Sequence, residues 1–206
     1  ADAAGALAYA HRLTDADGRL LQLVHRDVSP QNIMVSSDGI VKLVDFGIAK
    51  AVSKAEETRP GVVKGKYAYM SPEQTTGKPL DGRSDVFSLG VVLWEILAGR
   101  TIVERGDVVE AMKAMRDGRF KNIREVAPHT PPPLADAVSR ALTVRKDERP
   151  TAVQLQVMLE EYVKGAPRLA TPVQLAEWIR PRFPRGQVTG AHDTVGGDGA
   201  ARPAAP

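Results

Sequence analysis

A chain of 206 residues, of which 43% are hydrophobic and 26% charged, predicts one globular domain with a substantial core and a tail. Its net charge of +3 is small and its basic residues are interspersed with acids, which argues against nucleic acid or a membrane surface as a partner. The absence of cysteine excludes disulfides and thiolate metal sites.

The sequence has no apolar run of the roughly 20 residues that a membrane-spanning helix needs, and no signal peptide at its start. The segment nearest to that length, SDVFSLGVVLWEILAG, contains Asp85 and Glu95. We therefore expect a cytoplasmic location, with any membrane anchor outside this chain. Because the chain begins with Ala1 rather than Met, we also expect it to be a processed product or a fragment of a longer protein.

The first quarter of the chain predicts a helix followed by short strands. In chain order, the pattern indicates a helix over 3–13, a turn over 14–19, and strands over 20–25 (LLQLVH), 33–35 and 40–44. The last two strands flank a turn in which Gly39 suits a positive φ, and so form a hairpin. Since a hairpin brings its ends together, Asp27 and Asn32 before it should lie close to Asp45 after it.

The remainder of the domain is predicted to be helical. After a polar, irregular loop, helices are expected over 85–98, from 107, over 131–142 and over 151–163. The helix over 85–98 is apolar on nearly all sides and should be buried, with Gly99 ending it. Capping boxes are expected at the start of two helices, from Asp107 with Glu110 and from Thr151 with Gln154. The fold class is therefore mainly α with one small β-hairpin.

The composition shifts to proline, glycine and alanine from residue 165 onward, which marks the tail, 165–206. Residues 171–183 predict one short amphipathic helix with Pro172 at its first position. We favour packing of this helix on the domain over binding of a partner. From residue 184 the composition predicts disorder.

Two carboxylates and an amide, Asp27, Asn32 and Asp45, provide the oxygen ligands that suit Mg²⁺ rather than zinc. Phosphoryl transfer needs such ligands beside a separate base for the incoming hydroxyl. The motifs HRDVSPQN and DFG resemble the catalytic core of eukaryotic-like, bacterial-type protein serine/threonine kinases. GKYAYMSPEQ, DGRSDVFSLGVVLWEILAGR and RKDERPT are similar to later segments of that family and follow in its order. The resemblance covers residues 1 to about 164 and corresponds to the large, C-terminal lobe of a kinase.

The resemblance implies ATP and Mg²⁺ as cofactors and protein Ser/Thr hydroxyls as acceptors. It implies that Asp27 is the catalytic base, that Asn32 and Asp45 hold Mg²⁺, and that Met34 forms the floor under the adenine. Structural roles follow for five residues: stacking of His25 with Phe46, an ion pair between Glu73 and Arg149, and attachment of the catalytic-loop backbone by Asp85. Glu73 and Arg149 are structural under any interpretation.

Arg26 would bind a phosphate on the activation loop, for which Ser53 and Thr58 are candidate acceptors. A structural ion pair for Arg26, and unmodified hydroxyls at both loop positions, are the plainer alternatives. His11, His129 and His192 are scattered and predict no metal site.

Two positions depart from the family pattern. Ser29 stands where serine/threonine kinases usually carry a lysine that contacts the transferring phosphoryl group. Lys66 stands where the activation segment usually carries threonine, near the catalytic Asp. Our hypothesis is that Lys66 reaches into the site and supplies the charge that Ser29 lacks; the alternative is that Lys66 points into solvent. This pair of changes resembles a subset of bacterial kinases.

The chain contains no glycine-rich loop, no strand lysine and no helix glutamate to pair with it. We therefore expect the small lobe upstream, and this chain alone to be inactive. Two alternatives remain open. Ser29 and the missing lobe favour a pseudokinase that acts by binding, and the Asp…Asn…Asp arrangement also occurs in small-molecule phosphotransferases of the aminoglycoside-kinase type.

Overall fold

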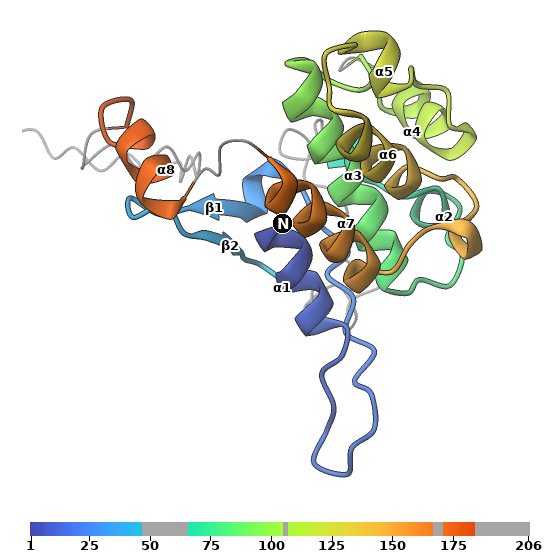
Figure 1. Ribbon diagram of the computed structural model, residues 1–206. Helices are drawn as coiled ribbons and strands as arrows, with labels where there is room; N and C mark the ends of the chain where they lie inside the picture. Colours follow the sequence, from blue (N-terminus) through green and yellow to red (C-terminus); the bar gives the residue numbers. More distant parts are fainter. Residues whose placement is uncertain (47–65, 105–106, 167–170, 184–206) are drawn as a thin grey trace, which may run out of the picture.

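The computed structural model describes residues 1–46, 66–104, 107–166 and 171–183. Its elements in chain order are α1 (Asp2–Ala10), η1 (Pro30–Asn32), β1 (Ile33–Val35), β2 (Val41–Leu43), η3 (Lys66–Tyr69), α2 (Pro72–Thr75), α3 (Gly82–Ala98), α4 (Val108–Asp117), α5 (Ile123–Val126), α6 (Pro132–Ala141), η4 (Lys146–Glu148), α7 (Ala152–Gly165) and α8 (Pro172–Ile179). The fold is mainly helical with one two-stranded sheet, which confirms the predicted class (Figure 1). The predicted loop over 51–64, its candidate acceptors Ser53 and Thr58, and the predicted disorder from 184 lie outside the described residues.

Helix α3 runs through the middle of the domain, between α1 with α7 on one side and α4 to α6 on the other (Figure 1). Val86 and Leu89 pack with α1 and α7, while Phe87, Val91 and Trp94 pack with α4 to α6. Its predicted burial is confirmed from Ser84 to Val92 and at Trp94, but not at its C-terminal end, where Ile96 is 71% exposed. Gly99 ends the helix at φ 63, as predicted.

Close packing of α3 against α6 depends on a glycine. A Cβ at Gly90 would lie 2.8 Å from the Cβ of Ala141, which is closer than side chains pack. Small residues on both helices therefore let the two backbones approach, and they fix α3 as the central support of the domain.

The hairpin forms as predicted, with Ile33 opposite Leu43 and Val35 opposite Val41. Gly39 in its turn has a φ of 77. The predicted strand over 20–25 is wrong: within the described residues Leu20 makes only an isolated bridge with Thr14, and Gln22 has a left-handed φ of 48 that interrupts an extended run. The backbone N–H groups that end this segment bind a side chain of α3 instead of a partner strand.

The predicted capping box is confirmed at Thr151 and Gln154, where each side chain binds the backbone of the other. At α4 only half of a box forms. Asp107 accepts from the N–H of Val109 and Glu110, but the Glu110 side chain pairs with Lys113, one turn further along the same face.

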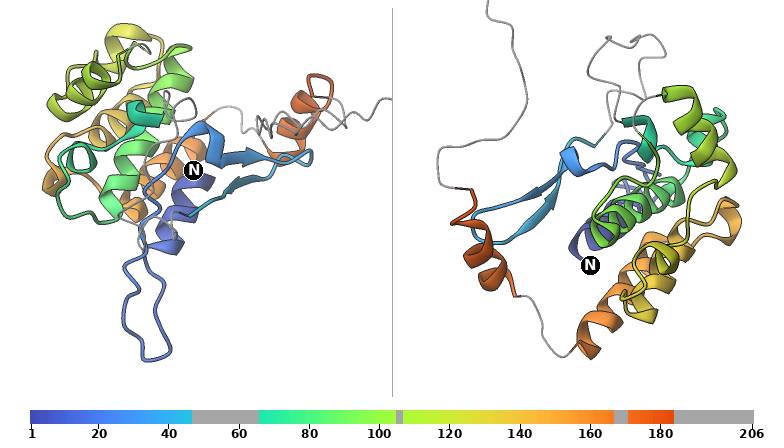
Figure 2. Two further views of the ribbon diagram at one scale, coloured as in Figure 1. Left: turned by 180° about the vertical axis from the view of Figure 1, so that it is seen from behind. Right: turned by 90° about the horizontal axis from the view of Figure 1, so that it is seen from above.

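Helix α8 packs on the domain, as favoured from the sequence, and lies beside the turn of the hairpin in both views of Figure 2. Arg180 donates to the carbonyl of Ser37 at 3.4 Å and lies 3.7 Å from the Asp38 carboxylate. Ala176 is 1% exposed at this contact, whereas Trp178 remains 54% exposed, so the helix packs through its small residue rather than its largest one. Within the described ranges, no helix is long and apolar enough to cross a membrane.

Candidate active site

One carboxylate from the centre of the domain holds the loop that leads into the hairpin. Asp85 on α3 is 1% exposed, and it accepts the N–H of His25 at Oδ2 and the N–H of Arg26 at Oδ1, both at 2.8 Å. Gln74 of α2 donates its Nε2 to the carbonyl of Arg26 at 2.9 Å. Arg26 is thereby held at φ 66, a left-handed conformation that costs a non-glycine residue about 1–2 kcal/mol. The strained residue directly precedes Asp27. Strained backbone conformations often cluster at functional sites.

His25 joins this loop to the far strand of the hairpin. Its ring is fully buried, its Nε2 donates to the carbonyl of Val44 at 2.9 Å, and its Nδ1 accepts the N–H of Asp27 at 3.3 Å. The rings of His25 and Phe46 have centroids 4.5 Å apart and are tilted by 47°. The backbone of Asp27 is therefore fixed relative to the residues that follow β2.

The hairpin register brings Asn32 and Asp45 to the same end of the sheet. The N–H of Val44 donates to the carbonyl of Asn32 at 2.9 Å, one step beyond the pair Ile33–Leu43. Asn32 is 5% exposed and donates its Nδ2 to the carbonyl of Asp27 at 2.7 Å, which keeps its side-chain oxygen for another partner. Asp45 follows Val44 at a left-handed φ of 58, with an exposed side chain.

An amide oxygen from Asn32 and a carboxylate from Asp45 are a donor set that fits Mg²⁺. Within the described part of the chain no three His, Cys, Asp or Glu side chains gather into a metal cage. An ion held by these two residues would complete its shell with water and phosphate oxygens, which is the usual arrangement for Mg²⁺. Met34 in β1 is 52% exposed, so it is accessible to a ligand at this sheet.

Lys66 provides a cation beside Asp27. Its Nζ lies 2.6 Å from Oδ2 of Asp27, and the two side chains are 31% and 16% exposed. Lys66 begins η3, which leads directly into α2. The side chain thus points to the carboxylate rather than away into solvent, and 39 residues of chain separate the partners.

Ser29 is buried two residues after Asp27. It is 1% exposed, and its Oγ has no hydrogen-bond partner among the described residues, while its carbonyl accepts the N–H of Asn32 at 3.0 Å. Ser29 therefore contributes backbone geometry to the loop and no charge. The positive charge next to Asp27 comes from the other segment, through Lys66.

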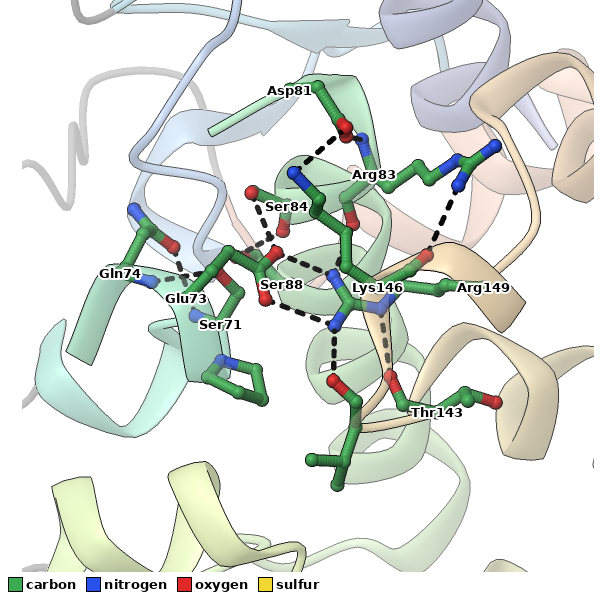
Figure 3. Close-up of polar contacts among 12 residues, drawn as sticks. Ser71, Glu73, Gln74, Asp81, Arg83, Ser84, Ser88, Thr143, Lys146 and Arg149 are labelled. Carbon is green, nitrogen blue, oxygen red and sulfur yellow. Dashed lines mark hydrogen bonds and ion pairs between the residues drawn. The ribbon is translucent and has the colours of Figure 1, made fainter. Parts of the chain in front are cut away.

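Glu73 and Arg149 form the expected ion pair beneath the site, with 6% and 0% of their side chains exposed (Figure 3). All five guanidinium N–H donors of Arg149 have a partner at 2.7 to 3.2 Å: both oxygens of Glu73 and the carbonyls of Arg83, Thr143 and Val144. The pair ties α2 to the loop before α7, and it places the guanidinium 4.9 Å from the ring of Phe87 on α3.

Burial alone would raise the pKa of the Glu73 carboxyl. The hydrogen bonds from Arg149 and Ser84, together with the positive charge of Arg149, outweigh that effect and hold the pKa below its usual value. Glu73 is therefore a buried carboxylate that stays ionised because its counter-ion is fixed.

Sequence reasoning missed three contributors: His11, whose Nε2 donates to Asp85 at 2.8 Å, and Gln74 and Ser84, which bind Arg26 and Glu73. No local pattern pointed to His11, because 74 residues separate it from its partner. Gln74 was within reach of prediction, since it is the partner of Ser71 in a capping box. The phosphate-binding role of Arg26 stays a prediction, because its candidate partners Ser53 and Thr58 lie outside the described residues.

Comparison with known proteins identifies a family and several relatives. Residues 3–162 match the model of the protein kinase domain. The chain is 42% identical over 170 residues to the tyrosine-protein kinase MasK of Myxococcus xanthus, which covers 80% of this chain and 26% of that protein.

Two relatives from Mycobacterium tuberculosis are named as serine/threonine kinases. The serine/threonine-protein kinase PknL is 34% identical over 189 residues, or 87% of this chain and 45% of that protein. The serine/threonine-protein kinase PknA is 39% identical over 151 residues, or 70% of this chain and 33% of that protein. The chain thus spans between about a quarter and somewhat under half of the length of these relatives. Its fold, its matched residues and its relatives all place the chain in the protein kinase family, in the bacterial type of its catalytic domain.

Proposed function

We propose that this chain is the large lobe of a protein kinase that transfers the γ-phosphoryl group of ATP to a hydroxyl group of a protein, with Asp27 as the base. The observation that carries the proposal is the contact of 2.6 Å between Lys66 and Asp27 at a loop whose backbone is fixed by Asp85. A degenerate binding module has no need to hold a strained residue in front of a carboxylate that is paired in this way.

In the proposed reaction the acceptor oxygen forms a bond to the γ-phosphorus, and the bond from that phosphorus to the bridging oxygen of ADP breaks. The hydroxyl proton passes to the Asp27 carboxylate. The Lys66 ammonium lies 2.6 Å from the Asp27 carboxylate and would stabilise negative charge that develops beside it. Asn32 and Asp45 would hold Mg²⁺, which when bound neutralises charge on the phosphate oxygens.

Residues 165–206, including α8, are proposed as a tail that follows the kinase lobe of residues 1–164. Met34, with half of its side chain exposed on β1, would contact the adenine. The small lobe that completes the nucleotide site in the family would come from the protein upstream of this chain. Arg26 would order the activation segment once Ser53 or Thr58 is phosphorylated.

The acceptor is proposed to be serine or threonine, as in the names of PknL and PknA. Tyrosine is a second candidate, favoured by the name of MasK, which is 42% identical. A small-molecule phosphotransferase is disfavoured by the match over residues 3–162 to the protein kinase domain.

The proposal is tested by incubating the full-length protein that carries this chain with ATP, Mg²⁺ and either a basic protein or small alcohols, beside an Asp27→Asn variant. Transfer to protein that requires Asp27, followed by phosphoamino-acid analysis, would establish the activity and choose between serine, threonine and tyrosine. If the protein binds nucleotide but shows no Asp27-dependent transfer, the pseudokinase is favoured. Buried Ser29, which stands where the family usually carries a lysine, would agree with that result.

A further inference from the structure

The hairpin of β1 and β2 is held at two places by different parts of the chain. At its base, Ile33 and Leu43 pair with each other and pack against the core cluster that α1, α3 and α7 share. At its turn, the contact comes from α8 in the tail, which lies beside the turn in both views of Figure 2. The core therefore fixes the base of the hairpin, and the tail holds its outer end.

One face of α8 is turned inward. Ala176 is 1% exposed, and its neighbours on the same side of the helix, Leu175 and Ile179, are half-buried. The opposite side lies in solvent, where Val173 is 65% exposed. The helix is thus amphipathic, and it uses its inward face against the hairpin.

The turn of the hairpin accepts this face through a buried glycine. A Cβ at Gly39 would overlap the carbonyl of Pro172 and lie 3.0 Å from the backbone nitrogen of Ala176. The two backbones therefore approach more closely than a side chain would allow. Arg180 adds a polar contact at the rim, 3.7 Å from the carboxylate of Asp38. Close backbone packing and a charge pair together make the contact specific for this turn.

The outer half of the hairpin needs such support. Each strand has three residues, and a two-stranded hairpin is marginally stable in water unless something packs on it. Fraying would begin at the pair nearest the turn, Val35 with Val41, and would reach Met34 next. It would stop at Ile33, which packs against the core. Met34 is therefore more sensitive to α8 than the residues at the base of the hairpin are.

Met34 lies on the face of the hairpin that points away from the core. Successive residues of a strand point to opposite faces, so Ile33 packs inward and Met34 points outward. Met34 stands opposite Lys42 and is 52% exposed. A nucleotide that contacts Met34 would rest on strands whose pairing depends on α8 at the turn.

We propose that α8 is a positioning element for the nucleotide, which closes the hairpin turn and thereby keeps Met34 in place against the adenine. The inference rests on the proposed function for the identity of the ligand and on the described contacts for the route. Because Asp27 and Lys66 lie beyond the base of the hairpin, release of α8 should weaken nucleotide binding and leave the transfer rate at saturating ATP unchanged. The tail then sets the affinity for ATP without touching the reacting groups.

The first test introduces glutamate on the two sides of α8 in the full-length protein and measures equilibrium binding of ADP with Mg²⁺. In Ala176→Glu the new charge falls at a position that is 1% exposed, which α8 can accommodate only by leaving the turn. We expect the Kd to rise roughly 3- to 10-fold, as it does when the binding-competent hairpin falls to about a third to a tenth of the molecules. Val173→Glu places the same residue on the exposed side of the same helix and should bind as wild type.

The outcomes of this test separate the inference from the proposed function. An unchanged Kd in Ala176→Glu would overturn the inference and leave the kinase assignment intact. A wild-type protein that binds no nucleotide would contradict the proposed function, and the inference with it.

Steady-state transfer at varied ATP distinguishes positioning of the nucleotide from general damage. Ala176→Glu should raise the KM for ATP by the factor seen in binding and keep kcat within about 2-fold of wild type. A lower kcat with an unchanged KM would contradict the proposed route, because the effect would then lie at the reacting groups rather than at Met34.

A charge exchange tests the contact without placing a charge in the buried face. Arg180→Glu sets two carboxylates beside each other at the turn, where the side chains of Arg180 and Asp38 are 61% and 69% exposed. At such exposure we expect the Kd to rise at most about 5-fold. The double variant Arg180→Glu with Asp38→Arg should return towards the wild-type value, because the pair forms again with its charges exchanged. No difference between the single and the double variant would contradict the contact.

Amide hydrogen exchange gives a readout that is independent of activity. The peptide containing residues 33–43 should exchange faster in Ala176→Glu than in wild type or Val173→Glu, whereas residues 24–28 should exchange as in wild type. Unchanged exchange in the hairpin would overturn the proposed route. Faster exchange with an unchanged Kd for ADP would show that α8 stabilises the hairpin without positioning it for the nucleotide, and it would also overturn the inference.

Discussion

Substitution of Arg149 by methionine should unfold the lobe at markedly lower denaturant concentration. Methionine fills most of the buried volume but carries no donor or charge. Glu73 would then remain 6% exposed with the Ser84 hydroxyl and without its counter-ion, and the carbonyls of Arg83, Thr143 and Val144 would lose their donor.

The size of this effect follows from burial. Removing one partner of a buried ion pair typically costs about 3–5 kcal/mol, because it strands the other charge. Solvent screening does not reduce the figure here, since the guanidinium is fully buried. The exposed pair of Arg124 and Asp136, with 51% and 61% of the side chains accessible, supplies the contrast: Arg124→Ala should cost about 0–1 kcal/mol.

Urea unfolding of the 206-residue chain measures both variants. Trp94 is 2% exposed on α3 and reports on the core, and a Trp178→Phe background removes the only other tryptophan. The double variant Glu73→Gln with Arg149→Met should recover part of the loss, because no charge is then left buried without a partner. A cost below about 1 kcal/mol for Arg149→Met would refute the reasoning.

Three further predictions concern pH, the tail helix and the metal. The pKa of Glu73 is lowered in the folded state. The stabilisation that its ionised carboxylate gives to the fold is therefore complete above the unfolded pKa of about 4.3 and is lost as pH falls through the folded pKa. Urea midpoints at pH 7 and pH 3.5 should differ less in Glu73→Gln than in wild type. Gly39→Ala should destabilise the chain more than Gly77→Ala: both glycines have positive φ, but a Cβ at Gly39 meets the backbone of α8, and equal thermal unfolding would contradict that contact. Asp45→Asn should raise the Mg²⁺ concentration for half-maximal transfer by the full-length protein, and an unchanged Mg²⁺ titration would exclude Asp45 as a ligand.

Local sequence signals predicted the parts of the fold that depend on neighbouring residues. The hairpin, the end of α3 at Gly99 and the capping box at Thr151 all follow from turn and cap chemistry within a few residues. The strand expected over 20–25 does not form because Gln22 adopts a left-handed φ of 48, and the N–H groups of His25 and Arg26 bind the distant Asp85 carboxylate. The apolar pattern of the segment shows neither feature.

In the candidate site, too, features set by neighbouring residues were predictable and those set by distant residues were not. Asp27, Asn32 and Asp45 were predictable because a hairpin brings its two ends together. The contact of Lys66 with Asp27 was only one of two alternatives, since spacing along the chain cannot state where a long side chain points. His11 was missed because a single histidine carries no local signal, and its partner on α3 is set by the packing of α1 against the core.

The most direct test of the account is the single-turnover rate of phosphoryl transfer by the full-length protein with Lys66→Met, measured beside wild type and Lys66→Arg. The account predicts a loss of about 100-fold or more in Lys66→Met, because a preorganised charge at the reacting groups is removed, and partial activity in Lys66→Arg. An unchanged rate in Lys66→Met would show that the charge 2.6 Å from Asp27 takes no part in the chemistry.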